Sequence, residues 1–132
     1  MGTAYVIDSN AVIDYLMGKL PADGMVFLSK VIDQIPFVSV ITKIEVLGFS
    51  APLESYGVLL NFFDDAIVFG LTEEVAEKTI ELRKQYKIKL PDAIIAATAL
   101  VNGCTLISRN VTDFKAIVEL SVVDPHDISL TA

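Results

Sequence analysis

Short apolar runs alternate with longer segments of helical pattern along this chain. The short runs are four or five residues long and predict five strands, at residues 4–8, 36–39, 66–69, 104–108 and 120–123. The longer segments place apolar residues at helical spacing and predict helices at residues 9–18, 23–35, 42–49, 53–65, 72–86 and 91–102. Helices that alternate with short apolar strands indicate an α/β fold with a mostly parallel sheet.

Two of the predicted helices differ in their surroundings. Residues 72–86 mix apolar and charged positions, so we expect an amphipathic, partly exposed helix with Thr72 as its N-cap. Residues 91–102 are apolar on nearly all sides, which predicts a buried helix that ends at Gly103. Buried helices of this kind are typical of the layer that covers a parallel sheet.

Composition indicates the number of domains, the cellular location and the contacts that we expect for the protein. The 132 residues suit a single domain of residues 1–132, and 53% of them are hydrophobic, which is rich for a small domain. No apolar run reaches the about 18 residues that span a bilayer, and the N-terminus lacks a secretory signal pattern, so we expect a cytoplasmic protein without membrane segments. The apolar excess predicts packing against a second copy or a partner, with residues 25–32 and 56–63 as candidate surfaces. Ordinary core faces are the alternative for both segments.

Four acidic residues adjoin the most apolar stretches of the chain. Asp8 ends the first predicted strand, and Glu45 lies in the helix after the second. Asp92 begins the buried helix, and Asp113 follows the strand at residues 104–108 by a short loop. Ligands of parallel sheets bind beyond the carboxyl ends of the strands, so these acids are candidates for a shared site at that edge.

Each acid also has a capping interpretation, which the residues alone leave open. Asp8 and Asp92 stand where helices begin, and the helix dipole favours a carboxylate there. Thr42 and Glu45 have the spacing of a capping box, and Asp113 stands near the start of a short helix predicted at residues 112–117.

A cluster of four carboxylates restricts the chemistry of the site. Two carboxylates about 4 Å apart repel by roughly 4 kcal/mol at an effective dielectric of 20, so a cluster needs raised pKa values or bound cations. The one histidine, His126, lies in a tail segment where we expect it to be exposed, and Cys104 is expected to be buried in a strand. An all-oxygen site suits Mg²⁺ or Mn²⁺, which most often serve phosphoryl chemistry. The net charge of −7 disfavours nonspecific binding to nucleic acid, unless several of the acids bind metal.

Four segments that carry these acids resemble PIN-domain ribonucleases, and in size most closely the VapC-type toxins of toxin-antitoxin pairs. The segments are VIDSN, ITKIEVL, LPDAIIAATAL and ISRNVTDF, with Ser108 where the family usually has threonine. The resemblance covers roughly residues 3–124. It implies a three-layer PIN-like fold with a five-stranded sheet in the order 3-2-1-4-5.

The resemblance also implies a function and a set of roles. The activity would be metal-dependent endonucleolytic cleavage of RNA, with Asp8, Asp92 and Asp113 holding one or two Mg²⁺ or Mn²⁺ ions. Glu45 would bind a second ion or orient the attacking water. Supporting hydrogen bonds would come from Ser9, Asn10, Ser108 and Asn110. Family members are commonly homodimers, and an antitoxin often lies across the active-site cleft.

Basic residues near these segments are candidates for contacts to RNA phosphates. The candidates are Lys43, Arg83, Lys84, Lys87, Lys89 and Arg109. For the four between residues 83 and 89, cations at a helix C-terminus are the alternative, because the helix dipole favours them there.

Two other functions are compatible with parts of this pattern. A noncatalytic module that binds RNA or a partner protein would keep the fold, although the presence of all four acids disfavours it. A phosphotransfer domain would use Asp8 as a covalent nucleophile. Haloacid dehalogenase-like phosphatases typically have a second Asp two positions later, where this chain has Asn10, and the third predicted strand lacks the phospho-accepting Asp of a receiver domain.

Overall fold

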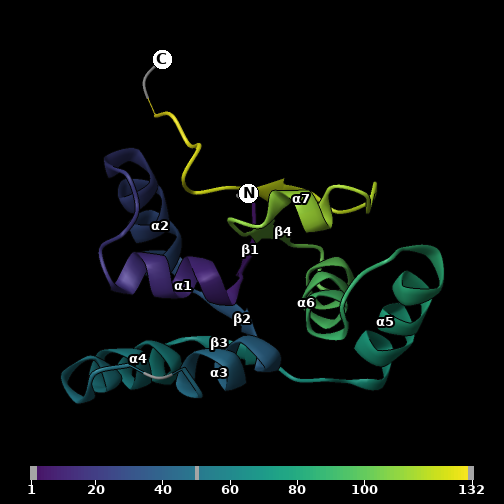
Figure 1. The fold of residues 1–132 in the computed structure, drawn as a ribbon, viewed down its shortest axis with the longest axis horizontal. Coiled ribbons are helices and arrows are strands. Elements are labelled where there is room, and N and C mark those ends of the chain that lie inside the picture. The colour runs from purple at the N-terminus through teal and green to yellow at the C-terminus, as the bar shows by residue number, and fades with distance from the viewer. Residues whose placement is uncertain (1–2, 50, 131–132) are drawn as a thin grey trace.

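Five short parallel strands form the centre of the computed structural model, which describes residues 3–49 and 51–130 (Figure 1). The strands are β1 (Tyr5–Ile7), β2 (Phe37–Ser39), β3 (Ile67–Phe69), β4 (Thr105–Ile107) and β5 (Val122–Val123). They pair in the order β3-β2-β1-β4-β5, and every pair is parallel. The α/β prediction and the strand order that the resemblance implies are both confirmed. β1 and β4, at the centre, flank the point where the strand order reverses.

Helices connect the strands. In the described residues they are α1 (Ser9–Leu16), α2 (Ala22–Gln34), α3 (Val40–Leu47), α4 (Leu53–Asp65), α5 (Glu73–Gln85), α6 (Leu90–Val101) and α7 (Val111–Phe114). Thr72 caps α5 by accepting a hydrogen bond from the amide of Val75, as predicted. Gly103 follows α6 with a φ of 64°, a conformation that glycine adopts at low cost, so the predicted end of this helix is also confirmed.

The capping alternative for Glu45 is wrong. α3 begins at Val40 rather than at Thr42, and its N-cap is Ser39, whose hydroxyl accepts a hydrogen bond from the amide of Ile41. Thr42 therefore lies inside the helix and does not form a capping box with Glu45. Its hydroxyl is fully buried and has no hydrogen-bond partner among the described residues.

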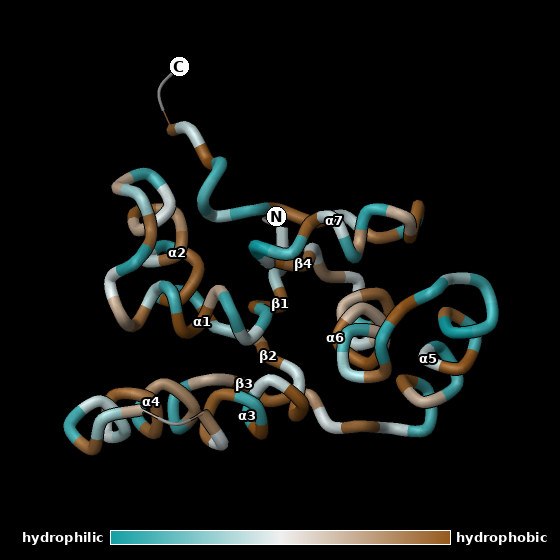
Figure 2. The backbone as a smooth tube through the Cα atoms, in the orientation of Figure 1, coloured by the Kyte–Doolittle hydropathy of each residue, from teal (hydrophilic) through white to brown (hydrophobic). Residues whose placement is uncertain are grey.

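Two hydrophobic cores lie on opposite faces of the sheet, because successive residues of a strand point to opposite sides. Val6 and Leu106 pack with residues of α5, α6 and α7. Ile7 and Ile107 pack with residues of α1, α2 and α4. Helices on both faces make three layers, with α5 and α6 on one side of the sheet and α1 and α2 on the other (Figure 1). Figure 2 shows hydrophobic residues in β1 and β2 near the middle and hydrophilic residues on the outer turns of α5.

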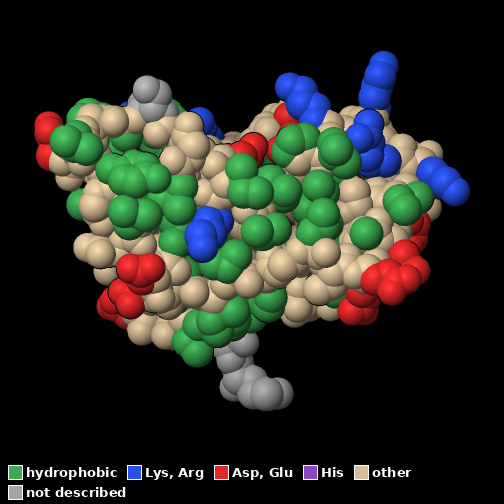
Figure 3. Space-filling model, turned by 90° about the horizontal axis from the view of Figure 1, so that it is seen from below, with side chains coloured by type: hydrophobic (Ala, Val, Ile, Leu, Met, Phe, Trp, Pro, Cys, Tyr) green, Lys and Arg blue, Asp and Glu red, His purple; other side chains and the backbone are tan. Residues whose placement is uncertain are grey.

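The two segments that we named as candidate contact surfaces serve first as core faces. Their buried side chains are Leu28, Val31, Leu59, Phe62 and Phe63. Only Val26, Val58 and Leu60 among their large apolar residues are exposed. The face seen in Figure 3 nonetheless carries hydrophobic side chains over α3 and α4. Ile44 of α3 and Leu53 of α4 are also exposed.

Two further expectations concern burial and membranes. No helix in residues 3–49 or 51–130 is long and apolar enough to cross a membrane. Cys104 is half-buried rather than buried, because it precedes β4 instead of lying within it. Burial raises the pKa of its thiol above the ordinary value.

The C-terminal segment packs against α2 at Gly24, and this contact leaves no room for a side chain. A Cβ on Gly24 would overlap the carbonyl oxygen of Pro125, which is backbone and cannot rotate away. We therefore expect Gly24→Ala to lower the free energy of unfolding by about 1–3 kcal/mol, although alanine is otherwise the better helix former. Thermal unfolding followed by circular dichroism measures the change.

A matched control for this substitution lies in α4. A Cβ added to Gly57 would have no heavy atom within 4 Å, so Gly57→Ala should raise the free energy of unfolding by about 0.5–1 kcal/mol. If Gly24→Ala stabilised the protein as much as Gly57→Ala, the packing of the C-terminal segment against α2 would be wrong.

Candidate active site

A cavity of 470 Å³ opens at the carboxyl ends of β1 and β4. In a parallel sheet this is where the strand order reverses and where ligands bind. Its lining comes from α1, α3, α6 and the segment after β4. The lining residues are Asp8, Ser9, Asn10, Ile13, Asp14, Lys19, Glu45, Phe49, Asp92, Arg109 and Asn110. Three of the four candidate acids thus lie in one cavity.

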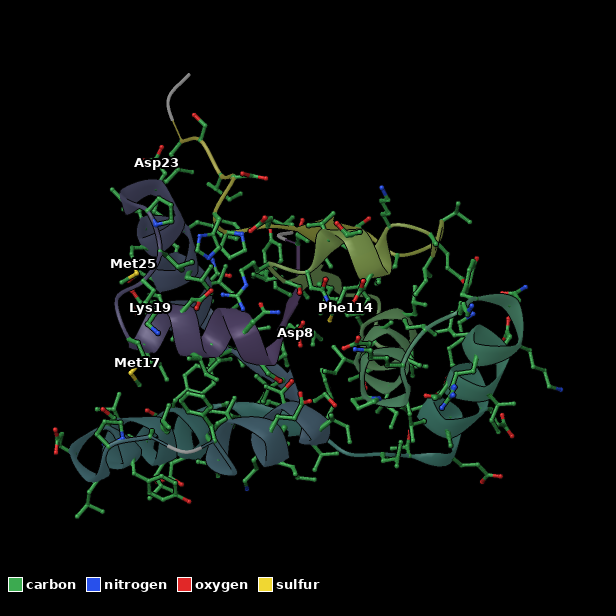
Figure 4. The ribbon with its side chains drawn as sticks, viewed as in Figure 1. Asp8, Met17, Lys19, Asp23, Met25 and Phe114 are labelled. Carbon is green, nitrogen blue, oxygen red and sulfur yellow. The ribbon has the colours of Figure 1, made fainter. Side chains whose placement is uncertain are left out.

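Asp8 is the most buried of the four acids, at 4% exposure. It follows β1 directly and stands at the start of α1, near the middle of the molecule (Figure 4). Its Oδ1 accepts a hydrogen bond of 2.8 Å from the amide of Ser9, so Asp8 is also the N-cap of α1. The capping and site interpretations are therefore compatible, because a carboxylate can cap a helix with one oxygen and face a cavity.

Hydrogen bonds fix the second carboxylate oxygen of Asp8. Its Oδ2 accepts from the Ser108 hydroxyl at 2.7 Å and from the Asn10 side-chain amide at 3.3 Å. The Asn10 amide lies 3.3 Å from the Ser108 hydroxyl as well, and that hydroxyl accepts from the amide of Asn110 at 3.0 Å. Ser108 follows β4, so this network ties the ends of the two central strands together. Residues with small polar side chains after both strands thus hold one carboxylate in a fixed position.

The environment of Asp8 raises its pKa to about 6, from an ordinary value of 3.8. Burial is the largest cause, since it disfavours the charged form. The hydrogen bonds from Ser108 and from the Ser9 amide oppose it, and the charges of Asp92 and Glu45 add to it. Asp92 and Glu45 line the same cavity as Asp8, so their negative charges disfavour ionisation of Asp8.

Asp92 is the second perturbed acid. It lies in the first turn of α6, which positions it beside the cavity. Its pKa is raised first by burial and then by the charges of Asp113 and Glu45, while Lys89 lowers it. Together with Asp8, these couplings link all four acids into one electrostatic cluster.

Glu45 and Asp113 are the two exposed members of this cluster. Glu45 extends from α3, and its Oε1 accepts a hydrogen bond of 2.6 Å from the Ser9 hydroxyl. Asp113 lies within α7 and outside the cavity lining, and its Oδ2 accepts from the Asn110 side chain at 2.8 Å. Asn110 occupies the N-cap position of α7 but makes this bond instead of capping the helix backbone. Ser9 at the start of α1 and Asn110 after β4 thus hold these two acids, and both partners line the cavity.

The donor set of this cluster fits a divalent cation. All the candidate donors are carboxylate oxygens, which Mg²⁺ and Mn²⁺ prefer. Burial and neighbouring carboxylates raise the pKa values of Asp8 and Asp92, and a bound cation would stabilise their charged forms. Within the part of the chain that the structure describes, no three His, Cys, Asp or Glu side chains have the arrangement of a metal site. Glu45 and Asp113 are exposed and instead hydrogen-bond to Ser9 and Asn110, so their side chains would need to rotate toward Asp8 and Asp92.

Few of the basic candidates lie in the cavity. Arg109 lines it, and Lys89 is near enough to affect Asp92. The others are not among the lining residues: Lys43, Arg83, Lys84 and Lys87. Arg83 and Lys84 occupy the last turn of α5, where the helix dipole favours them, which agrees with the capping alternative.

Sequence reasoning missed four polar or aromatic residues near the site. Asp14, Lys19 and Phe49 line the cavity, and the expectation that His126 is an exposed tail residue is wrong. The His126 side chain is 29% exposed, and its Nε2 lies 3.0 Å from Oδ2 of Asp14. The spacing of Asn10 and Asp14 is a signal that could have found Asp14, because residues four apart share a helix face.

Comparison with known proteins agrees with this geometry. The PIN domain family model matches residues 5–120 of the chain. A search of curated proteins finds no match. The matched range begins at β1 and runs past α7, so it contains all four acids.

Solved structures share the fold over nearly the whole chain. A toxin-antitoxin complex from Klebsiella pneumoniae is 29% identical, with 94% of this chain and 99% of that chain covered and a TM-score of 0.73. VapBC-1 from nontypeable Haemophilus influenzae is 26% identical, with coverages of 92% and 97% and a TM-score of 0.72. DNA-bound VapBC from Salmonella typhimurium has a TM-score of 0.77 and coverages of 94% and 99%, and at 22% identity it shows the fold alone.

Proposed function

This chain belongs to the PIN domain family, and on that premise we propose that it is a metal-dependent endoribonuclease, the toxin of a toxin-antitoxin pair. One observation carries the proposal: Asp8, Glu45 and Asp92 line one cavity at the carboxyl ends of the central strands, and Asp113 lies close enough to raise the pKa of Asp92. Structural ion pairs do not require such a cluster of like charges. Perturbed acids in a cleft are typical of catalytic sites.

The four acids would have different roles in the site. Asp8, Asp92 and Asp113 would hold Mg²⁺ or Mn²⁺, and Glu45 would bind a second ion or orient the attacking water. A divalent cation held there would supply the positive charge that activates water and stabilises the leaving oxygen. Ser9, Asn10, Ser108 and Asn110 would keep the carboxylates in position through the hydrogen bonds described above.

Cationic side chains of the cavity support a phosphodiester substrate. Arg109 and Lys19 line the cavity beside the acids, and a guanidinium matches the geometry of a phosphate. Phe49 is 45% exposed at the same cavity and offers a face on which a base could stack. In our proposal the RNA backbone passes from these cations to the carboxylate cluster.

Protein partners are part of this proposal. The solved relative from Klebsiella pneumoniae is described as a toxin-antitoxin complex, and this supports an antitoxin that binds the present chain. We also propose that residues 1–132 form one domain and that the chain is a homodimer. Exposed apolar side chains over α3 and α4 support a contact with another chain (Figure 3).

RNA cleavage by the purified chain tests the function. A mixed-sequence RNA incubated with the protein should yield discrete fragments in millimolar Mn²⁺ or Mg²⁺ and none in EDTA. Asp92→Asn serves as the control for contaminating nuclease, because it removes one carboxylate charge from the cluster. Cleavage that persists in EDTA, or in Asp92→Asn at the wild-type rate, would refute the proposal. Binding of the RNA without cleavage would indicate a noncatalytic module instead.

A further inference from the structure

Arg109 is held at two points on the wall of the cavity. Its backbone amide donates a 3.0 Å hydrogen bond to Oδ1 of Asn10. Its Nη1 lies 3.0 Å from Oδ2 and 3.3 Å from Oδ1 of Asp14, which is only 5% exposed. Both partners come from α1, so the guanidinium has a defined position relative to Asp8, which caps this helix. An arginine side chain without such contacts would lose much more side-chain entropy on binding a ligand.

The second partner of Asp14 comes from the far end of the chain. His126 places Nε2 3.0 Å from the same Oδ2 that Arg109 contacts. The backbone amide of His126 donates to Oδ1 of Asp124 at 2.8 Å, which orients the turn that carries the imidazole. Asp14 therefore bridges a cavity residue and a residue of the C-terminal segment. A buried carboxylate needs such partners, because burial without them is costly.

Contacts with α2 hold that segment in place. Pro125 is buried, and its carbonyl packs on Gly24 with no space for a side chain. Further along, the amide of Leu130 donates to Oδ2 of Asp23 at 3.2 Å. The segment after β5 is thus seated on α2 on both sides of His126.

We propose that His126 and Asp14 are positioning residues that hold Arg109 for contact with an RNA phosphate, so that the C-terminal segment forms part of the binding site. This inference rests on the proposed function and assigns one step of it to residues outside the carboxylate cluster. Arg109 keeps donors for the phosphate, because Asp14 engages only Nη1 while 56% of the Arg109 side chain is exposed. Asp14 orients the guanidinium of Arg109, and His126 holds the Asp14 carboxylate in place.

Four variants test this chain of contacts through the steady-state kinetics of RNA cleavage in Mn²⁺. Arg109→Ala should raise KM for the mixed-sequence RNA about tenfold or more with little change in kcat. His126→Ala should raise KM about threefold to tenfold, and His126→Gln should restore it, because the glutamine amide replaces the Nε2 donor. The double variant Arg109→Ala with His126→Ala should be no worse than Arg109→Ala alone, since His126 acts through Arg109.

Controls separate positioning from a general loss of structure. Asp127→Ala changes an exposed residue next to His126 and should leave KM and the melting temperature unchanged. Additive effects in the double variant, an unchanged KM in His126→Ala, or no rescue by glutamine would each overturn the inference while leaving the nuclease function intact. All variants should melt within a few degrees of the wild type.

A binding measurement separates this inference from the proposed function. Fluorescence anisotropy with a labelled 12-nucleotide RNA in EDTA reports affinity without cleavage. If the wild type binds this RNA but never cleaves it, the nuclease proposal fails, and the same variants then decide the positioning role through their dissociation constants. If the wild type neither binds nor cleaves RNA, both proposals are refuted.

Discussion

Replacing Asp8 with asparagine is expected to abolish RNA cleavage and, in metal-free buffer at pH 7.5, to make the protein more stable. The loss of activity should be at least about a hundredfold, because changes even to groups that only support a metal ligand cost 10–100-fold. The gain in stability follows from the burial of Asp8, which raises its pKa to about 6. A side chain of the same shape without the charge avoids that cost.

The sign of the stability effect follows from linkage. The pKa of Asp8 is about 6 in the folded protein and about 3.8 in the unfolded chain, so the folded state retains the proton to higher pH. Stability is therefore lost as pH rises from about 4 to about 6. The full difference between the two pKa values lowers the free energy of unfolding by about 3 kcal/mol at neutral pH. Asparagine recovers only part of it, since its NH₂ group would face the Asn10 amide and sacrifice a hydrogen bond worth about 1 kcal/mol. The net gain should be about 2 kcal/mol.

Chemical denaturation of both proteins at pH 7.5, 6 and 5 measures this effect. The advantage of Asp8→Asn should shrink steadily toward pH 5, where most of the Asp8 carboxyl in the wild type is already protonated. Asp64→Asn is the matched control, because Asp64 is an exposed acid at the end of α4 and should leave both stability and cleavage unchanged. An advantage that is equal at all three pH values would contradict the proposed cause.

The apolar pattern predicts the fold well because each strand is a short buried run. Residues 4–8 and 104–108 bracket β1 and β4 closely, since Val6, Ile7, Leu106 and Ile107 are all completely buried. Alternating helices then restrict the sheet to parallel connections. Asp8 could be identified for the same reason, because a carboxylate directly after a buried strand is rarely explained by solubility. The start of α3 was missed because Val40 and Ile41 continue the apolar run of β2 and hide the boundary at Ser39.

Long-range contacts account for what the sequence could not predict. His126 and Asp14 are 112 residues apart, and nothing local in the tail indicates that its imidazole returns to α1. Asp14 looked like an ordinary polar position on a helix, yet it is 5% exposed because Arg109 and His126 cover it. Lys19 lies just past the end of α1 (Figure 4), and it lines the cavity as well. Pairings of this kind depend on the finished packing, so they become visible only in the structure.

Addition of Mn²⁺ is expected to raise the melting temperature of the wild type by about 10 °C at pH 7.5. An ion at a hundred times its dissociation constant contributes about 2.7 kcal/mol, and for a domain of this size each kcal/mol is worth about 3–5 °C. The charges that destabilise the folded protein are those the ion would neutralise, so the stabilisation should be largest where Asp8 is ionised. At pH 5 the ion competes with the proton on Asp8, and the shift should be much smaller.

Differential scanning fluorimetry with Mn²⁺ in the wild type, Asp8→Asn, Asp92→Asn and Asp64→Asn distinguishes a specific site from general charge screening. The two cluster variants should lose most of the shift, whereas Asp64→Asn should keep it, because Asp64 lies on α4 outside the cavity. The net charge of −7 allows weak ion binding anywhere on the surface, and such binding would shift all four proteins equally. Equal shifts, or a shift as large at pH 5 as at pH 7.5, would therefore assign the stabilisation to the surface and remove the main support for a metal site at Asp8.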